Sequence, residues 1–175
     1  MNALTRKNLF CAFLVVYLSG CTHAPKGIEP VTGFELDRYL GQWFEIARLD
    51  HSFERGLTRV TADYRLRDDG GVDVVNRGYD ARKDKWKSAE GRAYFVEDPG
   101  TAHLKVSFFG PFYGAYVVFG LDPDYRYALV SGPDRDYLWI LAREPDLDQA
   151  IVDRLVTRAA ELGFPTDELI FVPHE

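Results

Sequence analysis

The side chains that most often carry out catalysis are scattered along this sequence. The four histidines, His23, His51, His103 and His174, lie far apart and lack the spacing of a metal site. His51 follows Asp50, but no serine or cysteine in a nucleophile motif accompanies the pair. Most acidic residues fall in segments expected to be turns, where solvation accounts for them. The sequence therefore predicts no catalytic set, no metal and no cofactor, so an enzyme is the weakest alternative.

The two cysteines, Cys11 and Cys21, point to a different chemistry. Cys11 lies in an apolar run, 9–18, that follows the basic residues Arg6 and Lys7. A run of about ten residues is too short to cross a hydrocarbon core of roughly 30 Å as a helix. It suits the apolar part of a secretory signal peptide, which is removed from the mature chain. Cys21 would then be the one remaining cysteine, so packing without a disulfide must hold the fold.

The residues around Cys21 resemble the lipobox of bacterial lipoproteins. Leu18-Ser19-Gly20-Cys21 has the leucine, the two small residues and the cysteine of that motif. The resemblance implies that residues 1–20 are a lipoprotein signal peptide and that Cys21 receives a diacylglyceryl thioether and an N-acyl group. Thr22 follows in place of Asp, which favours an outer-membrane location with the domain facing the periplasm. Several acyl chains give stable anchoring, because each buried methylene contributes about 0.8 kcal/mol.

The composition describes one globular domain with many strands. The chain has 175 residues, of which 46% are hydrophobic and 27% charged, so it can build a core. The formal net charge of −6 argues against a nucleic-acid partner. Aromatic residues make up 14% of the chain, and these favour strands because they pack well on a pleated surface.

Hydrophobic alternation and turn residues divide the chain into short elements. Residues 21–33 lack periodicity and contain Pro25, Gly27 and Pro30, so they are interpreted as the lipidated cysteine and a tether, which leaves 34–175 as the folded domain. The pattern predicts eight strands and a ninth short one near the C-terminus. Their ranges are 43–49, 58–67, 72–79, 85–97, 103–108, 115–121, 125–131 and 137–143, followed by 169–172.

A change of period after the eighth strand predicts a helix over 146–162. Asp146 or Asp148 suits its N-terminus and Gly163 its C-terminal stop. Eight strands with short connections and one amphipathic helix suggest an all-β fold, an eight-stranded antiparallel up-and-down barrel with a C-terminal α-helix. A β-sandwich would also contain many strands. A barrel of this size is either filled by side chains or holds one small ligand.

Three short motifs resemble those of the lipocalin family. Gly41-Gln42-Trp43 matches the Gly-x-Trp motif before the first strand, and Arg143 matches the motif arginine after the eighth. Asp124-Tyr125 occupies the place of the Thr-Asp-Tyr motif, with Pro123 where threonine would stand. The resemblance implies that the Arg143 guanidinium stacks over Trp43 at the closed end of the barrel. The segments 43–48, 107–112 and 136–143 are similar to those of the bacterial outer-membrane lipocalins.

The alternation of each strand predicts which side chains face the interior. If Trp43 and Arg143 lie inside, the same parity points Glu45 inward as well. The expected ligand-binding residues are Ala47, Val60, Ala62, Tyr64, Val74, Asn76, Tyr94, Val106, Phe108, Tyr116, Val118, Tyr137 and Trp139. This lining is apolar with a few polar tips, which suits an acyl chain with a polar head near the mouth.

The resemblance implies a lipid-binding function. The expected ligand is a fatty acid or a lysophospholipid, held for storage or transport in the cell envelope, and a homodimer is expected as well. One alternative is a structural envelope lipoprotein whose barrel is filled by its own aromatic side chains. The second alternative is a lipid-modifying enzyme.

Overall fold

The computed structural model of the protein describes residues 22–175, so the predictions for the signal peptide and for Cys21 lie outside the described residues. Within this range, no helix is long and apolar enough to cross a membrane. The elements are α1 (Leu36–Tyr39), β1 (Gly41–Arg48), β2 (Leu57–Leu66), β3 (Val72–Asp80), β4 (Lys85–Phe95), β5 (His103–Phe109), β6 (Phe112–Leu121), β7 (Tyr127–Ser131), β8 (Leu138–Ala142), α2 (Gln149–Glu161), the 3-10 turn η1 (Thr166–Glu168) and β9 (Ile170–Phe171).

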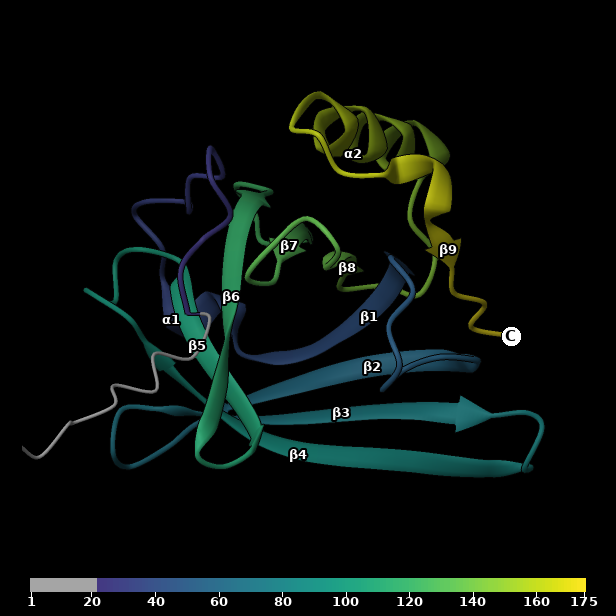
Figure 1. Cartoon of the computed structure of the whole chain (residues 1–175), viewed down its shortest axis with the longest axis horizontal. Coiled ribbons are helices and arrows are strands. Elements are labelled where there is room, and N and C mark those ends of the chain that lie inside the picture. The colour runs from purple at the N-terminus through teal and green to yellow at the C-terminus, as the bar shows by residue number, and fades with distance from the viewer. Residues whose placement is uncertain (1–21) are drawn as a thin grey trace, which may run out of the picture.

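The strands β1 to β8 form a closed antiparallel barrel (Figure 1). Each strand pairs with the next one along the chain, and β1 closes the sheet by pairing with both β8 and β2. Trp43 of β1 lies opposite Ala62 of β2, and Phe44 lies opposite Ala142 of β8. Closure leaves no free sheet edge between first and last strand. The predicted eight-stranded barrel with a C-terminal helix is therefore confirmed.

The hairpin of β2 and β3 shows why these residues form paired strands. Val60, Ala62 and Tyr64 alternate with more exposed residues, so one face of β2 is buried inside the barrel. The turn after β2 contains Gly70 with a φ of 78°, a conformation that costs glycine no steric strain. Register then runs from Leu66 opposite Val72 along the hairpin.

Helix α2 covers the outside of the barrel over β7, β8 and the end of β1 (Figure 1). The Asp148 carboxylate caps its first turn by accepting from the Ala150 amide at 2.8 Å. Its buried residues Val152, Leu155 and Ala159 pack in a hydrophobic cluster that includes Ile140 of β8. This outer cluster is separate from the cluster inside the barrel, so the helix protects one wall without entering the interior.

Residues 22–33, for which the sequence predicts a tether, are packed against the barrel in the structure. Ile28 is buried in the outer cluster under α2. The Val31 amide donates to Val118, and its carbonyl accepts from Ala102, both at 2.9 Å. His103 Nε2 lies 2.8 Å from the Thr22 carbonyl oxygen. The segment lacks periodicity because it is a single extended strap that buries isolated side chains. We call residues 22–33 the strap.

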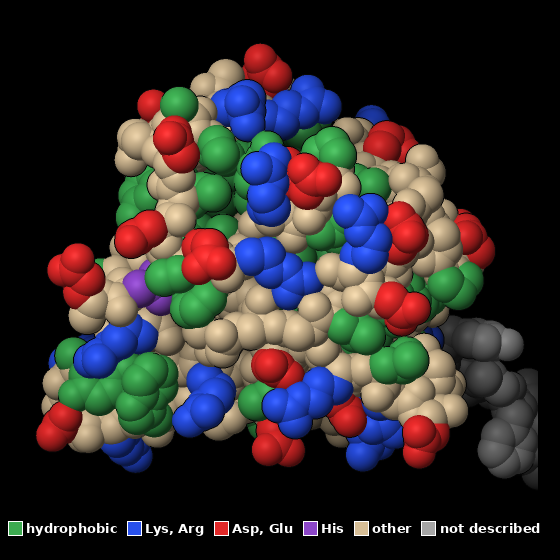
Figure 2. Space-filling model, turned by 180° about the vertical axis from the view of Figure 1, so that it is seen from behind, with side chains coloured by type: hydrophobic (Ala, Val, Ile, Leu, Met, Phe, Trp, Pro, Cys, Tyr) green, Lys and Arg blue, Asp and Glu red, His purple; other side chains and the backbone are tan. Residues whose placement is uncertain are grey.

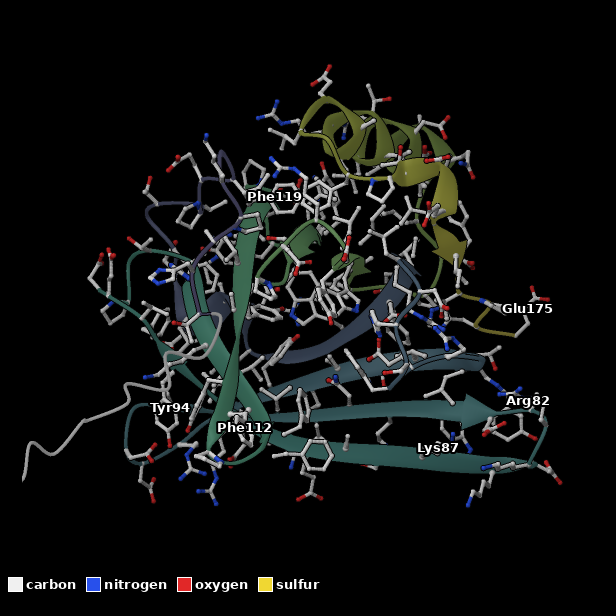
Figure 3. The ribbon with its side chains drawn as sticks, viewed as in Figure 1. Arg82, Lys87, Tyr94, Phe112, Phe119 and Glu175 are labelled. Carbon is white, nitrogen blue, oxygen red and sulfur yellow. The ribbon has the colours of Figure 1, made fainter. Side chains whose placement is uncertain are left out.

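Charged side chains of both signs are interspersed over the face seen in Figure 2, with small groups of hydrophobic side chains between them. The largest exposed apolar side chains include Phe109 and Phe112 at the turn between β5 and β6, with exposed fractions of 82% and 68%. Phe112 lies at the lower tip of the barrel in Figure 3.

Candidate functional site

The closed end of the barrel is built around Trp43, which is fully buried. The Arg143 guanidinium lies 4.0 Å from the centre of the Trp43 ring. Arg143 also donates to the carbonyls of Arg38 and Gln42 at 2.7 and 2.8 Å, so it ties the segment before β1 to the end of β8. Gly41 has a φ of 88°, and an added Cβ would lie 3.6 Å from the Arg143 guanidinium. The Gly-x-Trp and Arg motifs thus meet in space.

The turn between β6 and β7 carries the third motif. Tyr125 is buried, and its hydroxyl accepts from the Glu35 amide at 2.8 Å. Asp124 is exposed, and its neighbour Asp122 organises the turn by accepting from the amides of Asp124 and Arg126. The Arg126 guanidinium binds the same carboxylate, which lowers the pKa of Asp122 to about 2. Asp122 therefore fixes the turn, and Pro123 does not disturb it.

A cavity of about 290 Å³ occupies the barrel above this closed end. It reaches the end of the barrel at which the β1–β2 and β7–β8 connections lie, since Phe53, Glu54 and Pro133 line it. We call this end the mouth. The volume is close to the lower limit of known ligand pockets, about 300 Å³, and the lining is mostly apolar. The predicted residues that line it are Val60, Ala62, Tyr64, Val74, Asn76, Val106, Phe108, Tyr116, Tyr137 and Trp139.

The remaining three predicted residues lie elsewhere. Tyr94 lies on the outside of the barrel (Figure 3), where its hydroxyl donates to Asp69 at 3.2 Å and its ring contacts Tyr113. Its neighbour Ala93 takes the inward position in β4. Val118 is buried in the inner cluster with Trp43 and fills the barrel outside the cavity lining.

Ala47 faces helix α2, because a β-bulge interrupts the alternation of β1. Glu45 lies opposite Leu141, which faces inward, but Ala47 lies opposite Ile140, which packs under the helix. The extra residue shifts every later side chain of β1 to the other face. Arg48 lies opposite Trp139 and enters the interior, although strict alternation would place it outside.

The bulge creates a buried cluster of charged side chains near the mouth, formed by Glu45, Arg48, His51 and Glu54. Arg48 is 1% exposed; its guanidinium binds the Glu45 carboxyl and donates to the carbonyls of Glu54 and Leu57 at 2.9 and 3.2 Å. Trp139 Nε1 lies 3.3 Å from Glu54 Oε2. Glu45 and Glu54 line the cavity, but Arg48 lies behind them. We call these four residues the charged cluster.

Burial determines the protonation of the charged cluster. Desolvation raises the pKa of Glu45 well above its usual value, and the nearby Glu54 carboxylate raises it further. Desolvation also raises the pKa of Glu54. The pKa of His51 is lowered to about 4, first by desolvation and then by the Arg48 charge. Both carboxyls are therefore shifted toward the protonated form, opposite the single charge of Arg48.

The opposite end of the cavity has a floor of three tyrosines. The Tyr116 hydroxyl lies 2.7 Å from that of Tyr39 and 2.8 Å from that of Tyr64. Burial raises the pKa of each, so all three stay neutral at physiological pH. The Tyr39 ring packs on Trp43 with centroids 4.7 Å apart, which joins the floor to the closed end. Sequence alternation predicted Tyr64 and Tyr116 here but missed Tyr39, which precedes the first strand.

The described residues contain no group of three or more His, Cys, Asp or Glu side chains arranged to hold a metal ion. The site thus consists of an apolar cavity with a tyrosine floor at one end and the charged cluster near the mouth.

Comparison with known proteins agrees with this architecture. Residues 34–174 match the lipocalin-like domain. The chain is 54% identical to the outer membrane lipoprotein Blc of Vibrio cholerae over 95% of its length and 98% of that protein. It is 53% identical to the outer membrane lipoprotein Blc of Escherichia coli K12 over 92% of its length and 90% of that protein. These relatives confirm the predicted outer-membrane location.

Solved structures show the same fold at much lower sequence identity. The structure of insecticyanin from the tobacco hornworm Manduca sexta superposes with a TM-score of 0.69 at 20% identity, covering 87% of each chain. The relatives belong to a family of binding proteins rather than enzymes. The domain match over residues 34–174 and the identity above 50% along most of the chain show that this protein belongs to the lipocalin family.

Proposed function

We propose that the protein holds one fatty acid or lysophospholipid in its barrel, for storage or transport of lipid in the cell envelope. The observation that supports this function best is the apolar cavity of about 290 Å³ inside the barrel. A cavity that is apolar along its walls and polar near its mouth suits an acyl chain with a head group. Ten buried methylenes would contribute roughly 8 kcal/mol before the cost of association.

The cavity also bears on the alternative of a structural lipoprotein with a filled barrel. Aromatic side chains do fill the closed end, where Phe34, Tyr39 and Trp43 pack together. Above them, Phe108 and Trp139 stand at the cavity wall and leave its centre open. An open apolar space of this size favours a ligand, because an empty cavity forfeits packing contacts.

The proposal includes attachment to the outer membrane through acyl chains on Cys21. The lipobox supports it, and the two relatives described above are named outer membrane lipoproteins. The homodimer stays a prediction, which light scattering of the purified protein checks.

Mass spectrometry of lipid that co-purifies with the protein tests the function. The test uses residues 22–175, which contain the three hydrophobic clusters and the nine strands of the described part of the chain. We expect one fatty acid or lysophospholipid per barrel, and we expect the delipidated protein to bind oleate saturably at one site. A delipidated protein that binds neither oleate nor any lysophospholipid would leave a filled barrel as the better description.

A further inference from the structure

We infer that the wall of the cavity near the mouth is a subsite for an ammonium group on the head of the bound lipid. Two carboxyl side chains, Glu45 and Glu54, and three aromatic side chains, Phe53, Tyr137 and Trp139, line the same part of the cavity. The inference rests on the proposed function and names its class of ligand, a lysophospholipid with a cationic amine in preference to a free fatty acid.

The charges of the cluster leave a place for one more cation. Glu45 and Glu54 would carry two negative charges when ionised, and Arg48 supplies one positive charge. Arg48 is held by the Glu45 carboxyl and two backbone carbonyls and does not line the cavity. It therefore cannot reach a ligand, whereas the two carboxyls face the cavity. Burial raises the pKa of both carboxyls, so a proton and an ammonium group would compete to balance the second negative charge.

The aromatic side chains add a second attraction for a cation. The rings form a continuous row, because His51 stacks on Phe53 with centroids 4.0 Å apart and lies 5.9 Å from Tyr137. Tyr137 in turn lies 6.1 Å from Trp139. The negative faces of aromatic rings attract cations, and combinations of several rings bind alkylammonium groups. An acidic pair beside aromatic rings is therefore more selective for an amine than either feature alone.

His51 packs behind this wall, under Phe53 and Tyr137. Both ring nitrogens of His51 lack a hydrogen-bond partner, although its side chain is only 5% exposed. Its Nε2 lies 3.4 Å from Glu54 Oε2 without the geometry of a hydrogen bond. A neutral imidazole offers one donor and one acceptor. His51 does not line the cavity, so it supports the wall from behind and does not itself contact a ligand.

An anionic head is disfavoured at the same place. A free carboxylate beside Glu45 and Glu54 would add a third acidic group to a desolvated site, and like charges raise the cost of ionisation. Such a ligand would have to bind together with a proton. The wall thus discriminates between acyl lipids by the charge of the head group, while the apolar part of the cavity accepts any single chain.

The exchange of proton for ammonium makes binding depend on pH. Binding of an amine ionises the carboxyl pair and releases the proton, so its affinity rises with pH, whereas binding of an anion takes up a proton and weakens with pH. The other groups near the pair are few. Tyr64 of β2 stays neutral because burial raises its pKa, and His51 is neutral above about pH 5. Asp50 and Arg55 pair on the exposed side of the loop, and His174 contacts the backbone carbonyl of Glu45.

The test compares two lysophospholipids that share one oleoyl chain and differ in the head. Delipidated residues 22–175 are titrated with 1-oleoyl-lysophosphatidylethanolamine and 1-oleoyl-lysophosphatidylglycerol at pH 7.5, each below its critical micelle concentration. We expect about tenfold tighter binding of the ethanolamine lipid, the preference that one well-placed cation contact provides. Calorimetry in two buffers of different ionisation enthalpy should show proton release with the ethanolamine lipid only.

Variants locate the preference. Glu54→Gln should remove most of the tenfold preference, because it should lower the affinity for the ethanolamine lipid and leave the affinity for the glycerol lipid unchanged. Asp50→Asn removes a carboxylate from the same loop outside the cavity, so it should leave both affinities unchanged. If Glu54→Gln fails to fold, the proton release of the unaltered protein still decides the question.

Two results would overturn the subsite. One is equal affinity for the two lipids without proton release; the other is an equal loss of both affinities in Glu54→Gln. In both cases lipid binding persists, so the proposed function stands. Absence of binding by either lipid would instead remove the proposed function together with the subsite.

Discussion

The Arg143 guanidinium lies 4.0 Å from the centre of the Trp43 ring, although a hundred positions separate the two residues in the chain. Arg143 reaches this place from the end of β8, and Trp43 from the beginning of β1. The Trp43 Nε1 donates to the Tyr39 carbonyl at 2.8 Å, so the ring is fixed on both sides. This contact closes one end of the barrel and gives the cavity a bottom.

We expect each truncation at this contact to destabilise the fold and the pair to be non-additive. Trp43→Ala should lower the free energy of unfolding by about 3–5 kcal/mol, as for a buried aromatic side chain. Arg143→Ala removes the same stacked contact, so the double variant should lose less than the sum of the single losses. Urea unfolding of the four proteins measures this, and strictly additive losses would contradict a direct contact.

The buried pair of Arg48 and Glu45 leads to a prediction about pH. Arg48→Met leaves Glu45 and Glu54 without a cation, which should cost about 3–5 kcal/mol at neutral pH. The loss should shrink as the pH falls toward 5, because protonation of the two carboxyls removes the charge that Arg48 balances, and their raised pKa values favour that protonation. Urea unfolding at pH 5 and pH 8 compares the two conditions, and a loss that does not change with pH would show that the carboxyls do not depend on Arg48.

In the unaltered protein, the raised pKa of Glu45 should make the free energy of unfolding fall as the pH rises. A carboxyl whose pKa is higher in the folded state contributes its stability below its unfolded pKa and loses it as pH rises through the folded pKa. Glu45→Gln cannot ionise, so its free energy of unfolding relative to the unaltered protein should rise between pH 5 and pH 9. Glu29→Gln, on the exposed part of the strap, is the matched control and should follow the unaltered protein.

Tryptophan fluorescence separates the cavity from the surface. Trp139 lines the cavity, Trp43 is buried beneath it, and Trp86 is about half exposed on β4. Binding of oleate should change the emission mainly through Trp139, because lipid replaces water beside that ring. Trp139→Phe should therefore lose most of the change, and Trp86→Phe should keep it. A full response in Trp139→Phe would place the ligand elsewhere.

The lipid anchor is tested at Cys21. Cys21→Ala should no longer incorporate radioactive palmitate, and the protein should either leave the membrane fraction or remain uncleaved. The unaltered protein expressed in parallel gives the reference level of labelling. Labelling that persists in Cys21→Ala would show that the acyl chains attach at another residue.

Sequence patterns predicted the fold well because side chains alternate between the inside and the outside of the barrel along most of each strand. Alternation placed Tyr64 of β2 and Val74 of β3 correctly toward the interior, since the register between the two strands runs without a shift from Thr61 to Leu66. Val60 also faces the cavity, although a register shift lies between Thr58 and Thr61. The order of the motifs around Trp43 and Arg143 then indicated the barrel and its closed end. These features are local or are fixed by the family resemblance.

The parts that sequence reasoning missed depend on local breaks in alternation. One bulge in β1 turns Ala47 outward and Arg48 inward. The alternation of the sequence does not show where the extra residue lies. The sequence nevertheless contained an indication of this arrangement. Glu45 and Arg48 are the two charged residues of a mostly apolar strand, and opposite charges in a buried strand are expected to pair with each other. In β4 the small residue Ala93 faces inward and Tyr94 faces outward, so the parity that the sequence analysis assigned to this strand was wrong by one residue.

The strap has a mechanical consequence for a protein attached at Cys21. Thr22, the next residue, is already held to His103 of β5, and the chain stays bound to the barrel wall from there to β1. One peptide unit, about 3.8 Å between Cα atoms, would be all the slack between acyl chains and folded wall. A barrel attached at Cys21 would then stay close to the lipid surface. Because the connection is so short, the barrel could exchange lipid only with the membrane next to its anchor.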